Sequence, residues 1–298
     1  MRESQPHRLA VLIPFPWRRV VTWLAAGGLL AYLMPAAAGI VVLVQGYLGS
    51  GNNWRESGVV DALQRGGWRD GGHLQPPLFG WPVPGAAHGR NERLVYTLLL
   101  PTEAPLLVQA QYLAQYLGLL WDWRPQERVI LVGHSAGGVA ARLAMVRDPA
   151  ARITALITIA SPHLGTQSAE LGTLAGRSPL GWMAPFVGGD TLNRSQGLFQ
   201  DLMRERPNSL LFWLNRQPHP PAHYIAIVRT QKGFFGHGDL LIPAWSQDMN
   251  NVSALRGQAV RIAVNRSHGL HPEDGRLLVD ILRWIESTDG KRPIALDD

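Results

Sequence analysis

The chain has 298 residues, of which 46% are hydrophobic and 17% are charged. This composition supplies enough apolar material for a folded core and excludes an intrinsically disordered chain. The formal net charge of +6 comes from basic residues that are nearly all Arg, and they form no long run of the kind that binds nucleic acid. The absence of cysteine excludes disulfides, cysteine-ligated zinc and a thiol nucleophile. A chain of this length is typical of one large α/β domain or two small ones.

The first 38 residues combine a basic flank with an apolar segment. Residues 1–19 carry Arg2, Arg8, Arg18 and Arg19 against one acidic residue, and residues 20–38 carry no charge. A bilayer span needs about 20 apolar residues, and basic flanks tend to stay in the cytoplasm. We therefore predict an uncleaved anchor in the inner membrane, with the following domain on the periplasmic side. A cleaved signal peptide and an apolar helix of a cytoplasmic protein are the alternatives.

From residue 39 to the end, apolar runs alternate with helical stretches, and no internal repeat is present. Continuous apolar runs are typical of buried parallel strands. The alternation predicts an α/β domain over residues 39–298 with a doubly wound, mostly parallel sheet. The predicted strands are residues 40–44, 94–100, 129–132, 153–159, 224–228 and 260–264, and the predicted helices are residues 102–121 (with Thr102 at the N-terminal end), 137–147 and 273–286.

The segment between the fourth and fifth predicted strands, residues 163–222, is too long for an ordinary connection. We predict that it forms a helical cap inserted over the carboxyl ends of the strands. Its stretch 180–187 is unusually apolar for a surface insertion. This stretch is expected to cover acyl chains and to open at a lipid surface; simple packing within the cap is the alternative.

A G-x-S-x-G motif, Gly133-His134-Ser135-Ala136-Gly137, stands directly after a predicted strand and before a predicted helix. A serine on such a sharp turn has a strained backbone, and glycines on both sides leave room for it. The start of the helix favours a negative charge that develops beside the serine. We therefore predict Ser135 as a nucleophile; a Gly/Ser turn that only starts a helix is the alternative.

In this context the chain resembles the α/β-hydrolase family, and within it the bacterial lipases, the lipase-like esterases and the PGAP1-like lipid deacylases. Residues 41–50 resemble the oxyanion-hole strand and loop of the family, residues 158–166 the stretch after the next strand, and residues 238–243 the loop of the catalytic acid. Gln45 stands where many relatives have His. Since the oxyanion hole uses backbone N–H groups, this difference should change how the loop is braced without removing activity.

The family order along the chain, serine, acid and then histidine, selects the partners of Ser135. His268 lies in the loop after the last predicted strand and is the expected base, while His271 is read as a solvated residue before a helix. Asp239 lies in the loop after the preceding strand and is the expected acid, with Asp248 as the other candidate.

The expected oxyanion donors are the backbone N–H groups of Tyr47 and Ala136. For His163, a structural role in its loop is an equal alternative to substrate contact. No His/Asp cluster has zinc spacing, so we expect no metal and no cofactor, and a structural Ca²⁺ stays open. The residues expected to line the substrate site are Gln45, Gly46, His134 and His163.

These expectations describe a serine hydrolase that cleaves carboxylic esters, in particular acyl esters of lipids, through an acyl-enzyme. Its expected partners are a small-molecule or lipid ester and a membrane surface, without nucleic acid. The alternatives are a thioesterase or acyltransferase with the same three residues, and a non-catalytic, membrane-tethered binding protein built on a hydrolase scaffold.

Overall fold

The computed structural model describes residues 39–75, 92–125, 127–167, 191, 194–233, 236–237, 239 and 241–287. The predicted membrane anchor and the apolar stretch 180–187 lie outside these residues. Within the described ranges, no helix has both the length and the apolar character that a membrane span requires.

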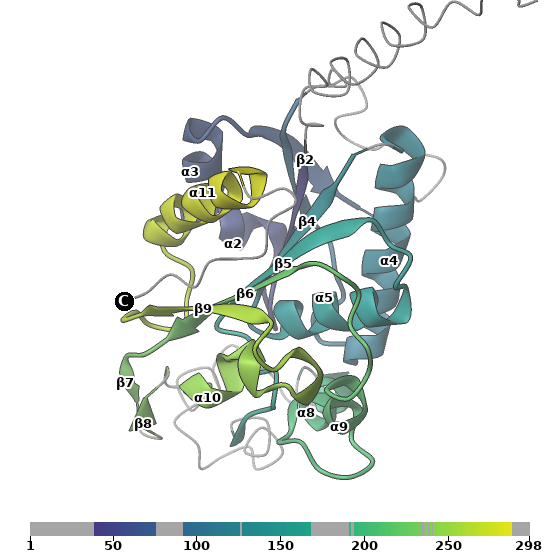
Figure 1. The fold of residues 1–298 in the computed structure, drawn as a ribbon, viewed down its shortest axis with the longest axis vertical. Coiled ribbons are helices and arrows are strands. Elements are labelled where there is room, and N and C mark those ends of the chain that lie inside the picture. The colour runs from purple at the N-terminus through teal and green to yellow at the C-terminus, as the bar shows by residue number, and fades with distance from the viewer. Residues whose placement is uncertain are drawn as a thin grey trace, which may run out of the picture. The chain divides into compact units, whose positions relative to one another are not determined.

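A parallel sheet of seven strands forms the centre of the domain, in the order β2-β3-β1-β4-β5-β6-β9 (Figure 1). Every neighbouring pair in this sheet is parallel. The predicted α/β class and doubly wound parallel sheet are therefore confirmed. The strands are β1 (Ile40–Val44), β2 (Arg69–Leu74), β3 (Leu94–Leu98), β4 (Val129–His134), β5 (Ile153–Ile159), β6 (His223–Arg229) and β9 (Ala259–Val264).

Within the seven-stranded sheet, the strand that the sequence analysis did not predict is β2, at one edge. Its sequence, RDGGHL, contains no apolar run, and it pairs only with β3. An edge strand has a neighbour on one side only and tolerates polar side chains that a central strand would exclude. Asp70 of β2, for example, forms an ion pair with Arg55 at 2.8 Å. Pairing with β3, rather than a local apolar pattern, therefore defines β2.

Helices cover both faces of the sheet (Figure 1). In β1, Ile40, Val42 and Val44 join the hydrophobic cluster formed with α4 and α5, whereas Val41 and Leu43 join the cluster formed with α2, α3 and α11. Successive side chains of a strand point to opposite faces, so one run of five apolar residues supplies both cores. The helices are α2 (Gly51–Glu56), α3 (Val59–Arg65) and α11 (Pro272–Ser287) on one face, and α4 (Leu106–Trp123) and α5 (Ala136–Arg147) on the other.

The N-terminal end of α4 differs from the prediction. The helix begins at Leu106, and Thr102 does not cap it. Instead, Asp201 of α8 (Gln196–Leu202) accepts a hydrogen bond from the Leu106 N–H at 2.8 Å. Burial raises the pKa of Asp201, and the bond to Leu106 opposes that rise. A carboxylate 95 residues away in the sequence thus occupies the position that a local side chain was expected to fill.

The elements beyond the carboxyl ends of the strands are short (Figure 1). Two of them, α8 and α9 (Leu210–Leu214), lie within the range where a cap was predicted; their role as a cap stays a prediction. The connection from β6 to β9 contains β7 (Lys232–Gly233), β8 (Gly236–His237), α10 (Ala244–Gln247) and the 3-10 helices η2 (Met249–Asn251) and η3 (Ser253–Leu255).

Replacing Asp201 with Ala should lower the free energy of unfolding by about 1 kcal/mol, because the first turn of α4 loses its side-chain acceptor. Asp201→Asn is the matched control, since it keeps an oxygen that can accept the Leu106 N–H and should cost less. Urea unfolding followed by circular dichroism measures both values. An Ala variant as stable as the wild type would mean that this contact does not stabilise α4.

Candidate active site

Ser135 lies on the turn between β4 and α5, with φ of 52° and ψ of −129°. A positive φ is uncommon for a residue other than glycine, and it is tolerated where the surrounding structure enforces it. The turn is packed against backbone on both sides. A Cβ on Gly133 would lie 2.3 Å from the Cα of Gly138, and one on Gly137 would lie 2.3 Å from the carbonyl oxygen of Gln45. The glycines of the motif are therefore required by steric contact.

His268, in the loop after β9, bridges the serine and an aspartate. Its Nε2 lies 3.1 Å from Ser135 Oγ, and its Nδ1 lies 2.8 Å from Asp239 Oδ2. The side chain of His268 is 20% exposed, whereas that of Asp239 is fully buried. The structure therefore brings Ser135, His268 and Asp239 together in one hydrogen-bonded line, with its acid end shielded from water.

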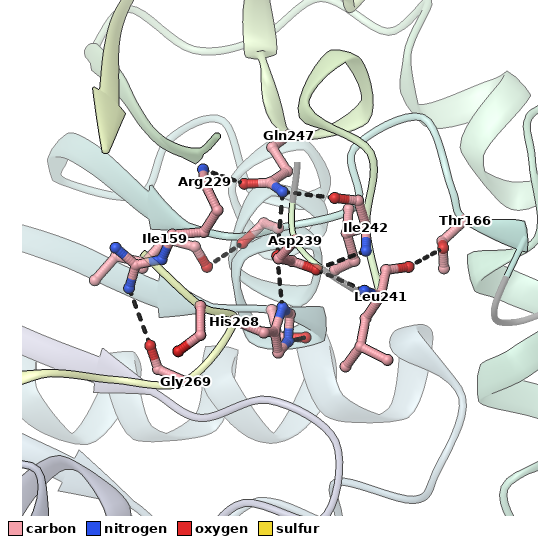
Figure 2. Close-up of polar contacts among 12 residues, drawn as sticks. Ile159, Thr166, Arg229, Asp239, Leu241, Ile242, Gln247, His268 and Gly269 are labelled. Atoms are coloured by element: carbon pink, nitrogen blue, oxygen red, sulfur yellow. Dashed lines mark hydrogen bonds and ion pairs between the residues drawn. The ribbon is translucent and has the colours of Figure 1, made fainter. Parts of the chain in front are cut away.

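The carboxylate of Asp239, between β8 and α10, is held by donors on both oxygens (Figure 2). Oδ1 accepts the backbone N–H groups of Leu241 at 2.8 Å and Ile242 at 2.7 Å. Oδ2 accepts His268 Nδ1 and, at 3.2 Å, Gln247 Nε2. Burial alone would raise the pKa of Asp239, but the hydrogen bond and charge of His268 and the two backbone N–H groups lower it overall. Asp239 is thus kept as an anion beside the imidazole.

The residues expected at the oxyanion hole lie in two turns next to Ser135. A Cβ on Gly46 would lie 2.8 Å from Ser135 Cβ, so the loop after β1 approaches the serine as closely as a backbone can. Gln45 is buried, and its Nε2 donates to the carbonyl oxygen of Leu98 at 2.9 Å. This bond ties Gln45 to the end of β3, and its role at the substrate site stays a prediction. The oxyanion role of Tyr47 and Ala136 stays a prediction.

The two histidines that were expected to line the substrate site have partners within the protein. His134 Nε2 lies 2.9 Å from the carbonyl oxygen of His268, and burial lowers the pKa of His134 to about 3. A neutral His134 can therefore donate to the His268 loop and hold it. His163 is fully buried, with Nε2 3.1 Å from Thr158 Oγ1. Both positions favour a structural role over substrate contact.

The other candidates for acid and base are engaged elsewhere. Asp248 accepts the N–H of Asn250 at 2.9 Å and lies 3.4 Å from Arg261 Nε. His271 Nε2 lies 2.9 Å from Ser267 Oγ. Among the described residues, no group of three His, Asp or Glu side chains could hold a metal ion.

Two residues that the sequence analysis missed support this site (Figure 2). Gln247, at the end of α10, contacts Asp239, and Arg229, at the end of β6, donates from Nη2 to the carbonyl oxygen of Gly269 at 3.0 Å. Neither belongs to a motif. The single signal in the sequence was Arg229, a charged residue directly after the predicted apolar strand 224–228.

The lowered pKa of Asp239 predicts a contribution to stability that depends on pH. A carboxyl group whose pKa is lower in the folded chain stabilises the fold above its unfolded value of 3.8, and this contribution disappears as the pH falls through the folded value. The free energy of unfolding of the wild type should therefore fall more steeply below about pH 4 than that of Asp239→Asn, which cannot titrate. Denaturant unfolding over the acid range measures both curves, and parallel curves would contradict the expectation.

Comparisons with known proteins agree with this fold. Residues 104–173 match the model of the PGAP1-like alpha/beta domain family, a segment that includes Ser135 and its motif. No curated protein matches the sequence.

Solved structures match over most of the chain. The lipase BlEst2 of Bacillus licheniformis in its mature form is 17% identical, with 85% of this chain and 93% of that chain covered and a TM-score of 0.61. The lin2722 gene product of Listeria innocua is 16% identical, and the match covers 87% of this chain and 99% of that chain with a TM-score of 0.57. The metagenomic carboxyl esterase MGS0156 is 18% identical, and the match covers 85% of this chain and 77% of that chain with a TM-score of 0.50.

At these identities the structural likeness establishes the fold. Together with the family match it confirms the resemblance seen in the sequence: the chain has the α/β-hydrolase fold, and its residues 104–173 are similar to the PGAP1-like alpha/beta domain.

Proposed function

We propose that this protein is a serine hydrolase that cleaves carboxylic esters, with Ser135 as the nucleophile, His268 as the base and Asp239 as the orienting acid. The observation that carries the proposal is the continuous line of contacts from Asp239 Oδ2 to His268 Nδ1 at 2.8 Å and from His268 Nε2 to Ser135 Oγ at 3.1 Å. Both distances are within reach of proton transfer. A lipase and a carboxyl esterase among the structures with the same fold add support.

In the proposed reaction, His268 Nε2 takes the proton of Ser135 Oγ as this oxygen attacks the acyl carbonyl carbon. Asp239 stabilises the imidazolium that forms, and its own charge is supported by two backbone N–H groups. The imidazolium then gives the proton to the leaving alkoxide, which departs as the alcohol and leaves the acyl group on Ser135. Water attacks this acyl-enzyme by the same route, and the carboxylic acid is released.

The oxyanion of each tetrahedral intermediate would be bound by the backbone N–H groups of Tyr47 and Ala136. Ala136 is the first residue of α5, where the unpaired N–H groups of a helix favour negative charge. The close approach of Gly46 to Ser135 brings the other turn within range. Loss of one oxyanion donor typically lowers the rate by ~10²–10³.

The partly exposed apolar side chains of the turn after Gly46, which approaches Ser135, support acyl esters of lipids as the substrate class. The ring of Tyr47 packs edge-on against Phe199 of α8 with ring centroids 5.2 Å apart, and the neighbouring Leu48 is 41% exposed. An acyl chain would gain from contact with such a surface, whereas a charged acyl group would not. Thioesters and acyl transfer to another acceptor would use the same three residues, so the comparison of substrates must include a thioester.

Ser135→Ala should abolish the hydrolysis of p-nitrophenyl esters with little loss of stability, since alanine removes the attacking oxygen and adds no bulk to the turn. Steady-state rates over acyl groups from acetate to palmitate, together with one thioester, measure activity and chain-length preference. A fluorophosphonate probe should label Ser135 in the wild type. If the wild type is neither labelled nor active, the chain is a binding protein on a hydrolase scaffold, and the proposal fails.

Two pairs of variants test the partners of Ser135. His268→Ala should lose as much activity as Ser135→Ala, whereas His271→Ala should stay within about threefold of the wild type because it has no part in proton transfer. Asp239→Asn should lose more activity than Asp248→Asn. A reversed order in either pair would require the roles to be exchanged.

We further propose that residues 20–38 tether the protein to the inner membrane, with residues 1–19 in the cytoplasm and the hydrolase domain on the periplasmic side. The support is the basic flank before an uncharged segment of 19 residues. A tether that ends directly before β1 would hold the domain close to lipid substrates. Residues Ala37–Asp298 form a compact unit of their own, which makes a truncation at residue 37 a workable test.

The full-length protein should sediment with membranes and resist a carbonate wash, while a truncation that begins at Ala37 should be soluble and keep full activity on a water-soluble ester. A full-length protein that stays in solution without detergent would contradict the tether. If the truncation fails to fold, the result would indicate that the hydrolase domain needs residues 20–36 for folding.

A further inference from the structure

We propose that Gln247 is a positioning residue that holds the carboxylate of Asp239 in line with His268, and that Arg229 couples this contact to the loop that carries His268. The inference rests on the proposed function, because it assigns a task to Gln247 in the proposed reaction. It concerns a residue that touches none of the reacting atoms and acts through Asp239.

The side-chain amide of Gln247 has an orientation that its partners determine. Its Oε1 accepts the backbone N–H of Arg229 at 2.7 Å. A backbone N–H can only donate, so the oxygen of the amide must face Arg229 and the nitrogen must face the other way. Nε2 therefore donates to Asp239 Oδ2 at 3.2 Å and to the carbonyl oxygen of Ile242 at 2.8 Å. Gln247 is 1% exposed, so water does not compete for these contacts.

The oxygen that Gln247 contacts is the one that accepts His268 Nδ1. Both hydrogen atoms of the amide are used, one on this oxygen and one on the backbone of the same loop. Rotation of the Asp239 carboxylate would break the contact with Gln247 together with the contact with His268. The amide therefore limits the direction in which Asp239 can offer its oxygen to the imidazole.

Arg229 links this contact to the loop after β9 (Figure 2). Its backbone N–H holds Gln247, while its buried guanidinium donates to the carbonyl oxygen of Gly269 at 3.0 Å and to both carboxylate oxygens of Asp274 at 2.9 and 2.7 Å. Asp274 in turn accepts the backbone N–H of His271 at 2.9 Å. Arg229 thus holds Gln247, and through it Asp239, by its main chain, and it holds the loop of His268 by its side chain.

Gln247→Glu tests the role of the donor through the pH dependence of the rate. A glutamate can still accept the Arg229 N–H, but its second oxygen would face two acceptors, Asp239 Oδ2 and the carbonyl oxygen of Ile242. It must hold a proton to make either contact, and loss of that proton would place two carboxylates against each other. The charged and titratable groups around this contact are His268, His134, Arg229, Asp274 and Arg266.

We expect kcat of Gln247→Glu to decline as the pH is raised over the range where the wild type keeps its maximum rate, with KM little changed. Gln247→Met keeps the volume of the side chain and removes both polar atoms. It should lower kcat by about 10- to 100-fold at every pH, because this is the typical cost of losing a hydrogen bond to a charged group. All rates are divided by the amount of folded protein, measured by circular dichroism, so that misfolded material is not counted.

Gln109→Glu is the matched control. Gln109, in α4, is also fully buried, and its Nε2 donates to the carbonyl oxygens of Thr102 and Ala104, which precede the helix. This substitution should lower stability and leave the shape of the pH profile unchanged. If the Gln247 variants also have profiles parallel to the wild type and kcat within twofold of it, the positioning role is overturned while the proposed function stands. If the wild type itself neither hydrolyses esters nor reacts with a fluorophosphonate probe, the proposed function fails.

Discussion

The buried ion pair between Arg229 and Asp274 is the interaction on which the arrangement of the site depends. Both side chains are fully buried, and they join the end of β6 to the start of α11. Burial would raise the pKa of Asp274, but the hydrogen bond and charge of Arg229 lower it overall. Two such charges taken out of water add little net stability, whereas loss of one partner leaves an uncompensated charge in the core and typically costs ~3–5 kcal/mol. The pair is thus a geometric constraint more than a source of stability.

Arg229 of this pair also fixes the loop of Asp239 and the loop of His268 relative to each other. The loop with Asp239 and the loop with His268 are separated by β9 in the sequence, and each alone could adopt many conformations. Contacts of Arg229 with Gln247 on one side and with Gly269 on the other place both loops relative to the end of one central strand. A site held in this way loses little entropy when substrate binds, because its groups are already oriented.

Ser135 is held by a different kind of constraint. Its turn depends on backbone atoms that pack closer than any side chain would allow, at Gly133, Gly137 and Gly46. The N–H of Ser135 also donates to the carbonyl oxygen of Ile159 at 2.9 Å, which ties the turn to β5. Steric exclusion thus fixes the serine, and polar contacts fix its two partners. The contact between Ser135 Oγ and His268 Nε2 joins these two parts of the structure.

The sequence by itself determined the features of this protein that are encoded locally. Apolar runs predicted six strands of the sheet, because a buried parallel strand needs continuous apolar residues, and the spacing of glycines predicted the turn of Ser135, because its backbone cannot accommodate side chains. Asp239 and His268 were selected over Asp248 and His271 only with the help of family order, since a sequence does not show which way a loop points. The edge strand β2, the contact of Asp201 with α4 and the link through Gln247 and Arg229 were decided by the tertiary structure alone. Each of these depends on partners that are distant in the sequence, and no local pattern records where a folded chain will bring such partners together.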